Sequence, residues 1–88
     1  MSDTESLLEF PCDLAIKAMG RSGENLQQRV LEHVRKHAPD TPDEAARETA
    51  SSRGRFVSIT VEIHAESREQ LDAIYQRLSD DPNILMAL

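Results

Sequence analysis

Arg55–Ala65 reads Arg-Phe-Val-Ser-Ile-Thr-Val-Glu-Ile-His-Ala, and this stretch decides the fold. Its apolar and polar residues alternate one by one. The apolar set is Val57, Ile59, Val61 and Ile63, and the polar set is Ser58, Thr60, Glu62 and His64. Because successive side chains of a β-strand point to opposite faces, the alternation predicts a strand with one covered and one open face. The rest of the chain must supply the cover.

The composition limits both the core and the partners. The chain has 88 residues, enough for one domain with a small core. Its only aromatic residues are Phe10, Phe56 and Tyr75, so we expect an aliphatic core. The formal net charge of −6 argues against a nucleic-acid partner, because binding to a phosphate backbone depends on basic surface.

The beginning of the chain and its single cysteine, Cys12, indicate a compartment. One thiol allows no internal disulfide and fits a reducing environment. The acidic start does not resemble a signal peptide, and no apolar run approaches the ~18–20 residues that span a bilayer. We therefore expect a cytoplasmic protein without a membrane segment.

Residues 1–8 are expected to form a flexible N-terminal arm, and residues 9–88 a single domain. Phe10–Met19 alternates in its later half and predicts the first strand. The side chains expected on its covered face are Leu14, Ile16 and Ala18.

A first helix is predicted over residues 23–37, with Ser22 as N-cap and Glu24 in its first turn. Pro39 ends this helix, because the residue before a proline avoids the helical region. The apolar stripe of the helix consists of Leu26, Val30, Leu31 and Val34.

Residues 40–52 admit two interpretations. Thr41-Pro42-Asp43-Glu44 has the pattern of a helix start, but the residues after it offer almost no apolar face. A polar edge strand, which would protect the sheet from pairing with neighbours, is favoured over a short helix. Residues 51–54 then form the hairpin turn into the strand at 55–65.

A second helix is predicted to begin at Ser67-Arg68-Glu69-Gln70, which matches a capping box. Its apolar stripe consists of Leu71, Ile74, Tyr75 and Leu78. Residues 79–83 are rich in turn formers, and Ile84–Leu88 reads as a last apolar strand.

The order strand, helix, strand, strand, helix, strand predicts an α+β fold, the ferredoxin-like βαββαβ sandwich. Its four-stranded antiparallel sheet would carry two helices on one face. Right-handed crossovers place the first strand beside the strand at 55–65 in the centre. In the last strand, Ile84 and Met86 are expected under the helices, and Leu85 and Ala87 on the open face.

Several short motifs resemble the YbeD-like family of small bacterial proteins. They are Leu7-Leu8-Glu9-Phe10-Pro11, Lys17, Met19-Gly20, His37-Ala38-Pro39 and Ser51-Ser52-x-Gly54-x-Phe56-x-Ser58. The similarity runs from Leu7 to Leu88, with a longer and more polar stretch at 40–50. The resemblance implies a ferredoxin-like fold similar to ACT-type regulatory domains, a domain of unknown function without assigned catalytic or binding residues, and an association with lipoate-synthesis genes.

The first candidate site is a loop between the first strand and the first helix. It consists of Gly20, Arg21, Ser22 and Gly23. Free amides at a helix N-terminus can hold an anion, and Arg21 adds positive charge. The resemblance to ACT-type domains implies an effector loop at this place. The alternative is a tight turn that needs glycine for a positive φ.

The second candidate site is the open face of the sheet. Its expected residues are Lys17, Met19, Ser58, Thr60 and Glu62, bordered by Ala15, Leu85 and Ala87. The interior of this face lacks the stacking aromatic residues of an RNA-binding sheet, so it suits a protein partner or self-association. The alternative is a solvated face with a Lys17–Glu62 cross-strand pair.

The histidine spacing and the single cysteine do not predict a metal site or a catalytic residue. His33 and His37 have the spacing of a metal half-site, but no third ligand is evident. Cys12 has no general base at a recognisable spacing and reads as a structural thiol. We expect no enzyme, metal or cofactor. The favoured function is a regulatory or adaptor protein that binds a protein partner, with a homodimer as one option. The alternative is an ACT-like sensor of an anionic or amino-acid effector at Gly20–Gly23.

Overall fold

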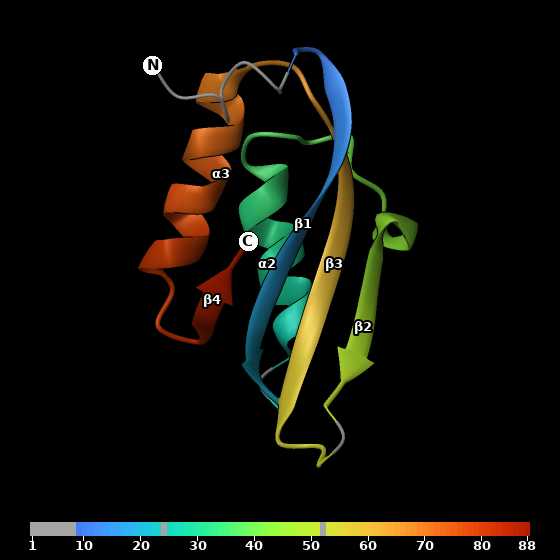
Figure 1. The fold of residues 1–88 in the computed structure, drawn as a ribbon, viewed down its shortest axis with the longest axis vertical. Coiled ribbons are helices and arrows are strands. Elements are labelled where there is room, and N and C mark those ends of the chain that lie inside the picture. The colour runs from blue at the N-terminus through green and yellow to red at the C-terminus, as the bar shows by residue number, and fades with distance from the viewer. Residues whose placement is uncertain (1–8, 24, 52) are drawn as a thin grey trace.

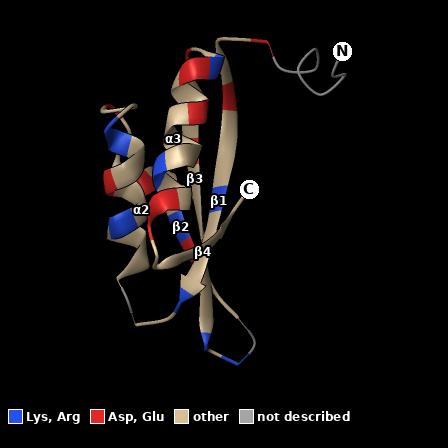
Figure 2. Cartoon of the chain, turned by 90° about the vertical axis from the view of Figure 1, so that its left-hand side faces the viewer, with Lys and Arg blue, Asp and Glu red and all other residues tan. Residues whose placement is uncertain are grey.

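The structure, a computed structural model, describes residues 9–23, 25–51 and 53–88. The elements follow the order β1 (Cys12–Arg21), α2 (Leu26–Arg35), η1 (Asp43–Ala45), β2 (Ala46–Ala50), β3 (Phe56–Ala65), α3 (Arg68–Asp80) and β4 (Ile84–Ala87). The strands form one antiparallel sheet in the order β2-β3-β1-β4 (Figure 1). Both helices lie on the same side of this sheet (Figure 2). The predicted ferredoxin-like fold is therefore confirmed.

β3 is a central strand, and its two faces differ as the sequence predicts. Val57, Ile59, Val61 and Ile63 are buried, whereas the residues between them are exposed or half-buried. β1 lies beside β3 in an unbroken antiparallel register from Cys12–Ala65 to Arg21–Phe56. Opposed residues of such a pair share a face, so β1 adds its own buried side chains to the same layer.

The helices supply the cover of this layer. The buried side chains of α2 are Leu26, Val30, Leu31 and Val34, and those of α3 are Leu71, Ile74 and Leu78. These stripes have the helical spacing of an amphipathic face. The core is aliphatic, as expected, and Phe10 and Tyr75 pack against it only partly buried.

The predicted start of α3 is confirmed, but the predicted start of α2 is wrong. The Ser67 hydroxyl accepts the Gln70 N–H at 3.1 Å, and the Gln70 side chain accepts the Glu66 N–H at 2.6 Å. α2 instead begins at Leu26, after Asn25 in the left-handed conformation. Ser22 does not cap α2, because its hydroxyl donates to the carbonyl of Gly54 in the β2–β3 turn at 2.6 Å. Glu24 lies outside the described residues.

The described residues between 40 and 52 form both a short helical turn and an edge strand, the two structures that the sequence allows. A single 3-10 turn spans Asp43–Ala45, and β2 follows it at Ala46–Ala50. The turn ends because Ala46 adopts an extended conformation and pairs with Val61 on β3. The favoured edge strand is confirmed, and the helix start is limited to that one turn.

The expected facing of β4 is wrong from Met86 onward. Met86 lies opposite Met19 and is 52% exposed, whereas Ala87 lies opposite Ala18 and packs against the core. The cause is a register shift between Met19 and Gly20, which inserts one extra residue into β4. Because strand side chains alternate, one extra residue exchanges the two faces.

We expect Ile59→Ala to lower the free energy of unfolding by about 2–5 kcal/mol, because it opens a cavity in the core beneath the helices. Ile59 is 0% exposed. The matched control is Thr60→Ala on the opposite face, with an expected change of at most about 0.5 kcal/mol. Urea denaturation of both variants measures the difference. Equal losses would contradict the assignment of the two faces of β3.

Candidate functional site

The open sheet face brings the predicted residues together. Met19 lies opposite Ser58 and Lys17 lies opposite Thr60, so these side chains share the face that no described helix covers. β2 extends the face, because Arg47 lies opposite Thr60. The face therefore runs across the two long strands β1 and β3 and the shorter β2, and it presents mainly small polar and basic side chains in its middle.

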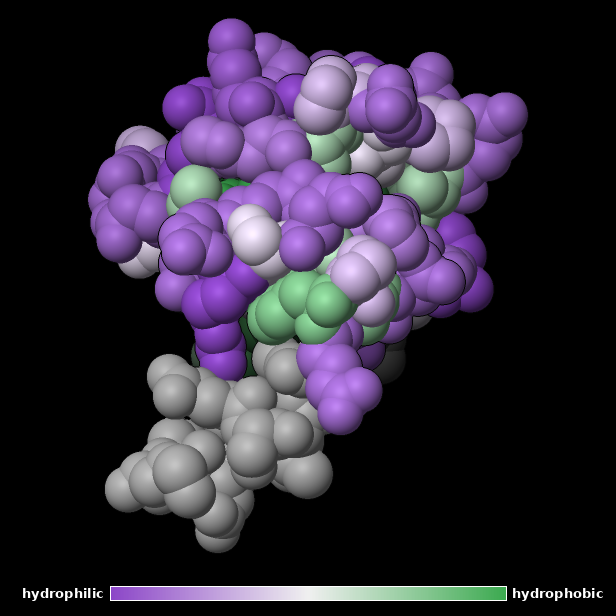
Figure 3. All heavy atoms as spheres, turned by 90° about the horizontal axis from the view of Figure 1, so that it is seen from above, coloured by the Kyte–Doolittle hydropathy of each residue, from purple (hydrophilic) through white to green (hydrophobic). Residues whose placement is uncertain are grey.

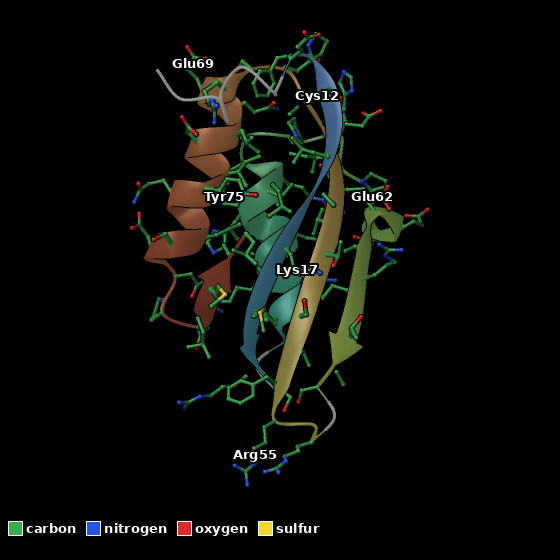
Figure 4. The ribbon with its side chains drawn as sticks, in the orientation of Figure 1. Cys12, Lys17, Arg55, Glu62, Glu69 and Tyr75 are labelled. Atoms are coloured by element: carbon green, nitrogen blue, oxygen red, sulfur yellow. The ribbon has the colours of Figure 1, made fainter. Side chains whose placement is uncertain are left out.

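The predicted cross-strand pair between Lys17 and Glu62 is wrong. The register places Glu62 opposite Ala15, whereas the residue opposite Lys17 is Thr60. Glu62 therefore lies on the neighbouring strand but not directly across from Lys17; both are labelled in Figure 4. Glu62 instead lies 4.0 Å from Arg47 of β2, and both side chains are about two-thirds exposed. An ion pair this exposed contributes little to stability. Lys17 enters no ion pair with the residues that the structure describes.

One end of the open face is apolar. Met19 and Met86 are cross-strand neighbours, and Phe56 lies at the start of β3, diagonal to Met19. We call Met19, Phe56 and Met86 the apolar end. Phe56 and Met86 are 41% and 52% exposed, and Leu85 beside them is also exposed. The opposite end of the molecule presents mostly hydrophilic residues (Figure 3).

Arginine residues border the apolar end. Arg21 lies opposite Phe56, and Arg53 and Arg55 belong to the turn between β2 and β3. Basic residues mark this end in Figure 2, and Figure 4 labels Arg55 at the tip. None of the three forms an ion pair with another described residue. An acidic chain thus carries a locally basic tip.

The candidate loop Gly20–Gly23 is attached to this tip. The Ser22 N–H donates to the Arg55 carbonyl at 2.9 Å, so this amide is already bonded. Gly20 is required for close approach rather than for a positive φ, because a Cβ atom there would lie 2.5 Å from the Asn83 carbonyl oxygen. Gly23 does have a positive φ of 90°. The anion site at this loop stays a prediction.

A buried ionic cluster lies on the helical side, and the sequence analysis missed it. The side chain of Asp81, only 4% exposed, follows the C-terminus of α3. Its Oδ2 accepts from Arg29 Nε at 2.6 Å and contacts His33 Nε2 at 2.7 Å, and its Oδ1 accepts the Asn83 N–H at 2.9 Å. The cluster ties α2 to the turn before β4. The i, i+4 spacing of Arg29 and His33 was the signal that could have found it.

Opposing effects act on the pKa of Asp81. Burial alone raises this pKa, because it disfavours the charged form. The hydrogen bonds from His33, Asn83 and Arg29, together with the Arg29 charge, outweigh burial and hold the pKa below its usual value. His33 was considered with His37 as a metal half-site, yet it faces this carboxylate. Within 9–23, 25–51 and 53–88, no cluster of three metal-ligating side chains occurs.

A second histidine–aspartate pair, formed by His64 and Asp13, lies on the open face. His64 Nδ1 is 2.8 Å from Oδ1 of Asp13 on the neighbouring strand. The hydrogen bond to Asp13 raises the pKa of His64, desolvation opposes this increase, and the charges of Glu66 and Asp13 add to it. Both side chains are well exposed, so the pair is a surface feature. Cys12 is half-buried against the core.

The fold and the face together define a class: a small α+β domain of ferredoxin-like topology that leaves one side of its sheet open. Residues 5–88 match the family described as "Protein of unknown function (DUF493)". UPF0250 protein NE1487 of Nitrosomonas europaea is 45% identical over 84 residues, which cover 96% of this chain and 97% of that protein. A UPF0250 protein of Neisseria gonorrhoeae is 41% identical, over 94% of this chain and 91% of its own length.

This chain belongs to the DUF493 family, whose members include the UPF0250 proteins, and the resemblance to the YbeD-like proteins is confirmed. The solution structure of protein HP0495 from H. pylori superposes with a TM-score of 0.68 at 14% identity, over 92% of this chain and 85% of that chain. That likeness supports the fold. No helix in the described part of the chain is long and apolar enough to cross a membrane.

We expect Asp81→Asn to lower the free energy of unfolding at pH 7 by about 1–3 kcal/mol, because it weakens three hydrogen bonds at a buried site. Since the folded-state pKa of Asp81 is lowered, its contribution is present above the unfolded value of about 3.9 and is lost as pH falls through the folded value. The variant should therefore approach the wild type below about pH 4.

Urea denaturation at several pH values measures this convergence. The matched control is Asp80→Asn, whose exposed carboxylate accepts a bond only from Gln76 among the described side chains. A variant whose deficit stays constant down to low pH would contradict the role given to the Asp81 charge.

Proposed function

We propose that this protein is a non-enzymatic adaptor that binds a partner protein through the apolar end of its open sheet face. The observation that carries the proposal is the cross-strand pair of Met19 and Met86 on a face that no described helix covers. Large apolar side chains on a surface mark interaction sites when they gather in one place. Here the exposed ones are Phe56, Leu85, Met86 and Leu88, in or next to β4 and at the adjoining end of β3.

The chemistry of this end supports a protein as the partner. Methionine is flexible and polarisable, so it adapts to varied apolar surfaces. Methionine, arginine and aromatic residues are the types enriched at protein interfaces. Arg21, Arg53 and Arg55 border the apolar end and favour a partner with carboxylates beside an apolar segment. The family resemblance makes proteins of lipoate synthesis the first partners to test.

The second candidate function is an ACT-like sensor of an anionic effector at Gly20–Gly23. The basic tip favours it, because the loop is hydrogen-bonded to the turn that carries Arg53 and Arg55. A ligand there should raise the melting temperature and require Arg21. A partner protein should instead require Met86, so the two functions predict different sensitive residues.

We expect Met86→Asp to reduce partner capture at least about tenfold, because it places a carboxylate in the middle of an apolar contact. The measurement is quantitative mass spectrometry of proteins captured by the wild type and by variants from the native cell extract. Gln28→Asp is the matched control: it adds the same charge at an exposed position on α2, on the helical side of the sheet.

Proteins that are lost with Met86→Asp and kept with Gln28→Asp are the partners that the proposal requires. An identical set of captured proteins for all three chains would overturn it. Light scattering of the purified chain shows whether a second copy is the partner. In that case Met86→Asp should convert a dimer into a monomer.

A further inference from the structure

β3 is longer than its neighbour β2, so part of its edge has no partner strand. β3 spans Phe56–Ala65, whereas β2 pairs only with the stretch from Val57 to Val61 (Figure 1). In an antiparallel sheet, the N–H and C=O groups of successive residues point alternately to the two neighbouring strands. The stretch of β3 without a neighbour on the β2 side therefore begins at Glu62 and ends with the strand.

The backbone groups of Glu62 and His64 are directed to this free edge. On β1, Lys17 uses its N–H and C=O in hydrogen bonds to Leu88, at 2.9 and 2.7 Å. The alternation then gives β1 its bonds to Ile63 of β3, so the groups of the residues on either side of Ile63 point away from β1. No described residue hydrogen-bonds to the main-chain N–H or C=O of Glu62 or His64. A sheet edge with such groups is a template for a further strand.

The loop that follows α2 leaves this edge open, because it bonds to itself and to α2. The Thr41 N–H and hydroxyl both donate to the Ala38 carbonyl, at 3.2 and 2.8 Å. Arg35 Nε of α2 donates to the Thr41 carbonyl at 2.8 Å. Pro39 and Pro42, on either side, have no N–H to offer to a strand. The loop is therefore a fixed wall beside β3 and not a partner strand.

Two hollows lie on the two faces of this strand end. One, of about 340 Å³, is on the helical side, between the 38–42 loop and Gln70 of α3. The other, of about 420 Å³, is on the open face, between Asp13 of β1 and Arg47 of β2. Both are lined by the strand end itself, Glu62, Ile63 and His64. Because side chains of a strand alternate between faces, a strand added here would send them in turn into the two hollows.

The lining of the hollows defines the segment that fits. The carboxylates around them are Asp13, Asp40, Glu62 and Glu66. The basic groups are the guanidinium of Arg47 and the imidazole of His64, so the lining is negative overall. The apolar residues of the hollow on the helical side are Ala38, Pro39, Pro42 and Ile63. Charge complementarity therefore favours an extended segment with basic side chains toward the open face and apolar ones toward the helices.

We propose that the free edge of β3 at residues 62–65 binds an extended segment of a partner protein as an added strand, and that this segment alternates basic and apolar residues. Its main chain exchanges hydrogen bonds with His64 and continues alongside Glu62. Its basic side chains meet Asp13 and Glu62 on the open face, and its apolar ones enter the hollow beside Ile63. This edge lies at the other end of β3 from Phe56, so it is separate from the apolar end.

The test is an NMR titration of the full chain with a short peptide that alternates lysine and valine and has blocked termini. We expect saturable shifts of the backbone amides of Glu62 and His64. Hydrogen exchange at the His64 amide should become at least about tenfold slower in the saturated complex, because a bonded N–H is protected from exchange.

Backbone methylation of the peptide separates strand addition from simple charge attraction. In one methylated peptide, the N–H groups of alternate residues are blocked. In the other, the blocked groups are those of the residues between them. An added strand turns only one of these two sets toward β3. We therefore expect one methylated peptide to bind at least about tenfold more weakly than the parent peptide, and the other to bind within about twofold of it.

Charge variants locate the bound peptide. Glu62→Lys should weaken binding of the parent peptide at least about tenfold, because it replaces an attracting charge with a repelling one. The matched control is Glu32→Lys, the same exchange at an exposed position on α2, with an expected loss of less than about threefold.

Shifts that do not saturate, or two methylated peptides that bind alike, would overturn the proposal. Saturable binding that Glu62→Lys leaves unchanged, or that both charge variants weaken equally, would overturn it as well, because the peptide would then lie elsewhere or be held by net charge alone. Saturation at His64, with selective loss for one methylated peptide and for Glu62→Lys, would support it.

Discussion

The burial of one face of β3 under two helices is the constraint on which the rest of the structure depends. Val57, Ile59, Val61 and Ile63 supply it, and each buried side chain of this size contributes roughly 1.5–3 kcal/mol. A shift of register by one residue would move the whole set to solvent. The register of β1 and β2 against β3 is therefore fixed, and it determines which residues occupy the open face.

The short strand β4 shows how a local irregularity changes a functional surface. Gly20 lies so close to the Asn83 carbonyl that a side chain could not fit, and Ile84 pairs with Gly20 at this point. The register shift beside it turns Met86 toward the open face and Ala87 toward the core. Met86 belongs to the apolar end because of this shift, since without it Met86 would face the core and Ala87 the open side.

The elements that the sequence predicts well are those with strong periodicity. The alternation of β3 and the capping box at Ser67 are local patterns with a direct physical cause, and both appear as predicted. The N-cap of α2 and the facing of β4 were wrong because they depend on distant partners: the Gly54 carbonyl for Ser22, and a register shift for Met86. The Asp81 cluster joins residues about fifty positions apart, so the i, i+4 spacing of Arg29 and His33 marks one side of it but does not identify Asp81 as the partner.

The assignment of the two faces of the sheet can be measured through the solvent exposure of methyl groups in the dilute, purified chain. A soluble paramagnetic agent enhances the NMR relaxation of methyl groups that it can approach. We expect strong enhancement at the terminal methyl of Met86, intermediate enhancement at the methyls of the half-buried Met19 and Thr60, and very little at Ile59. Protection of Met86 equal to that of Ile59 would contradict this assignment, because the Met86 side chain would then point into the core and not toward the open face.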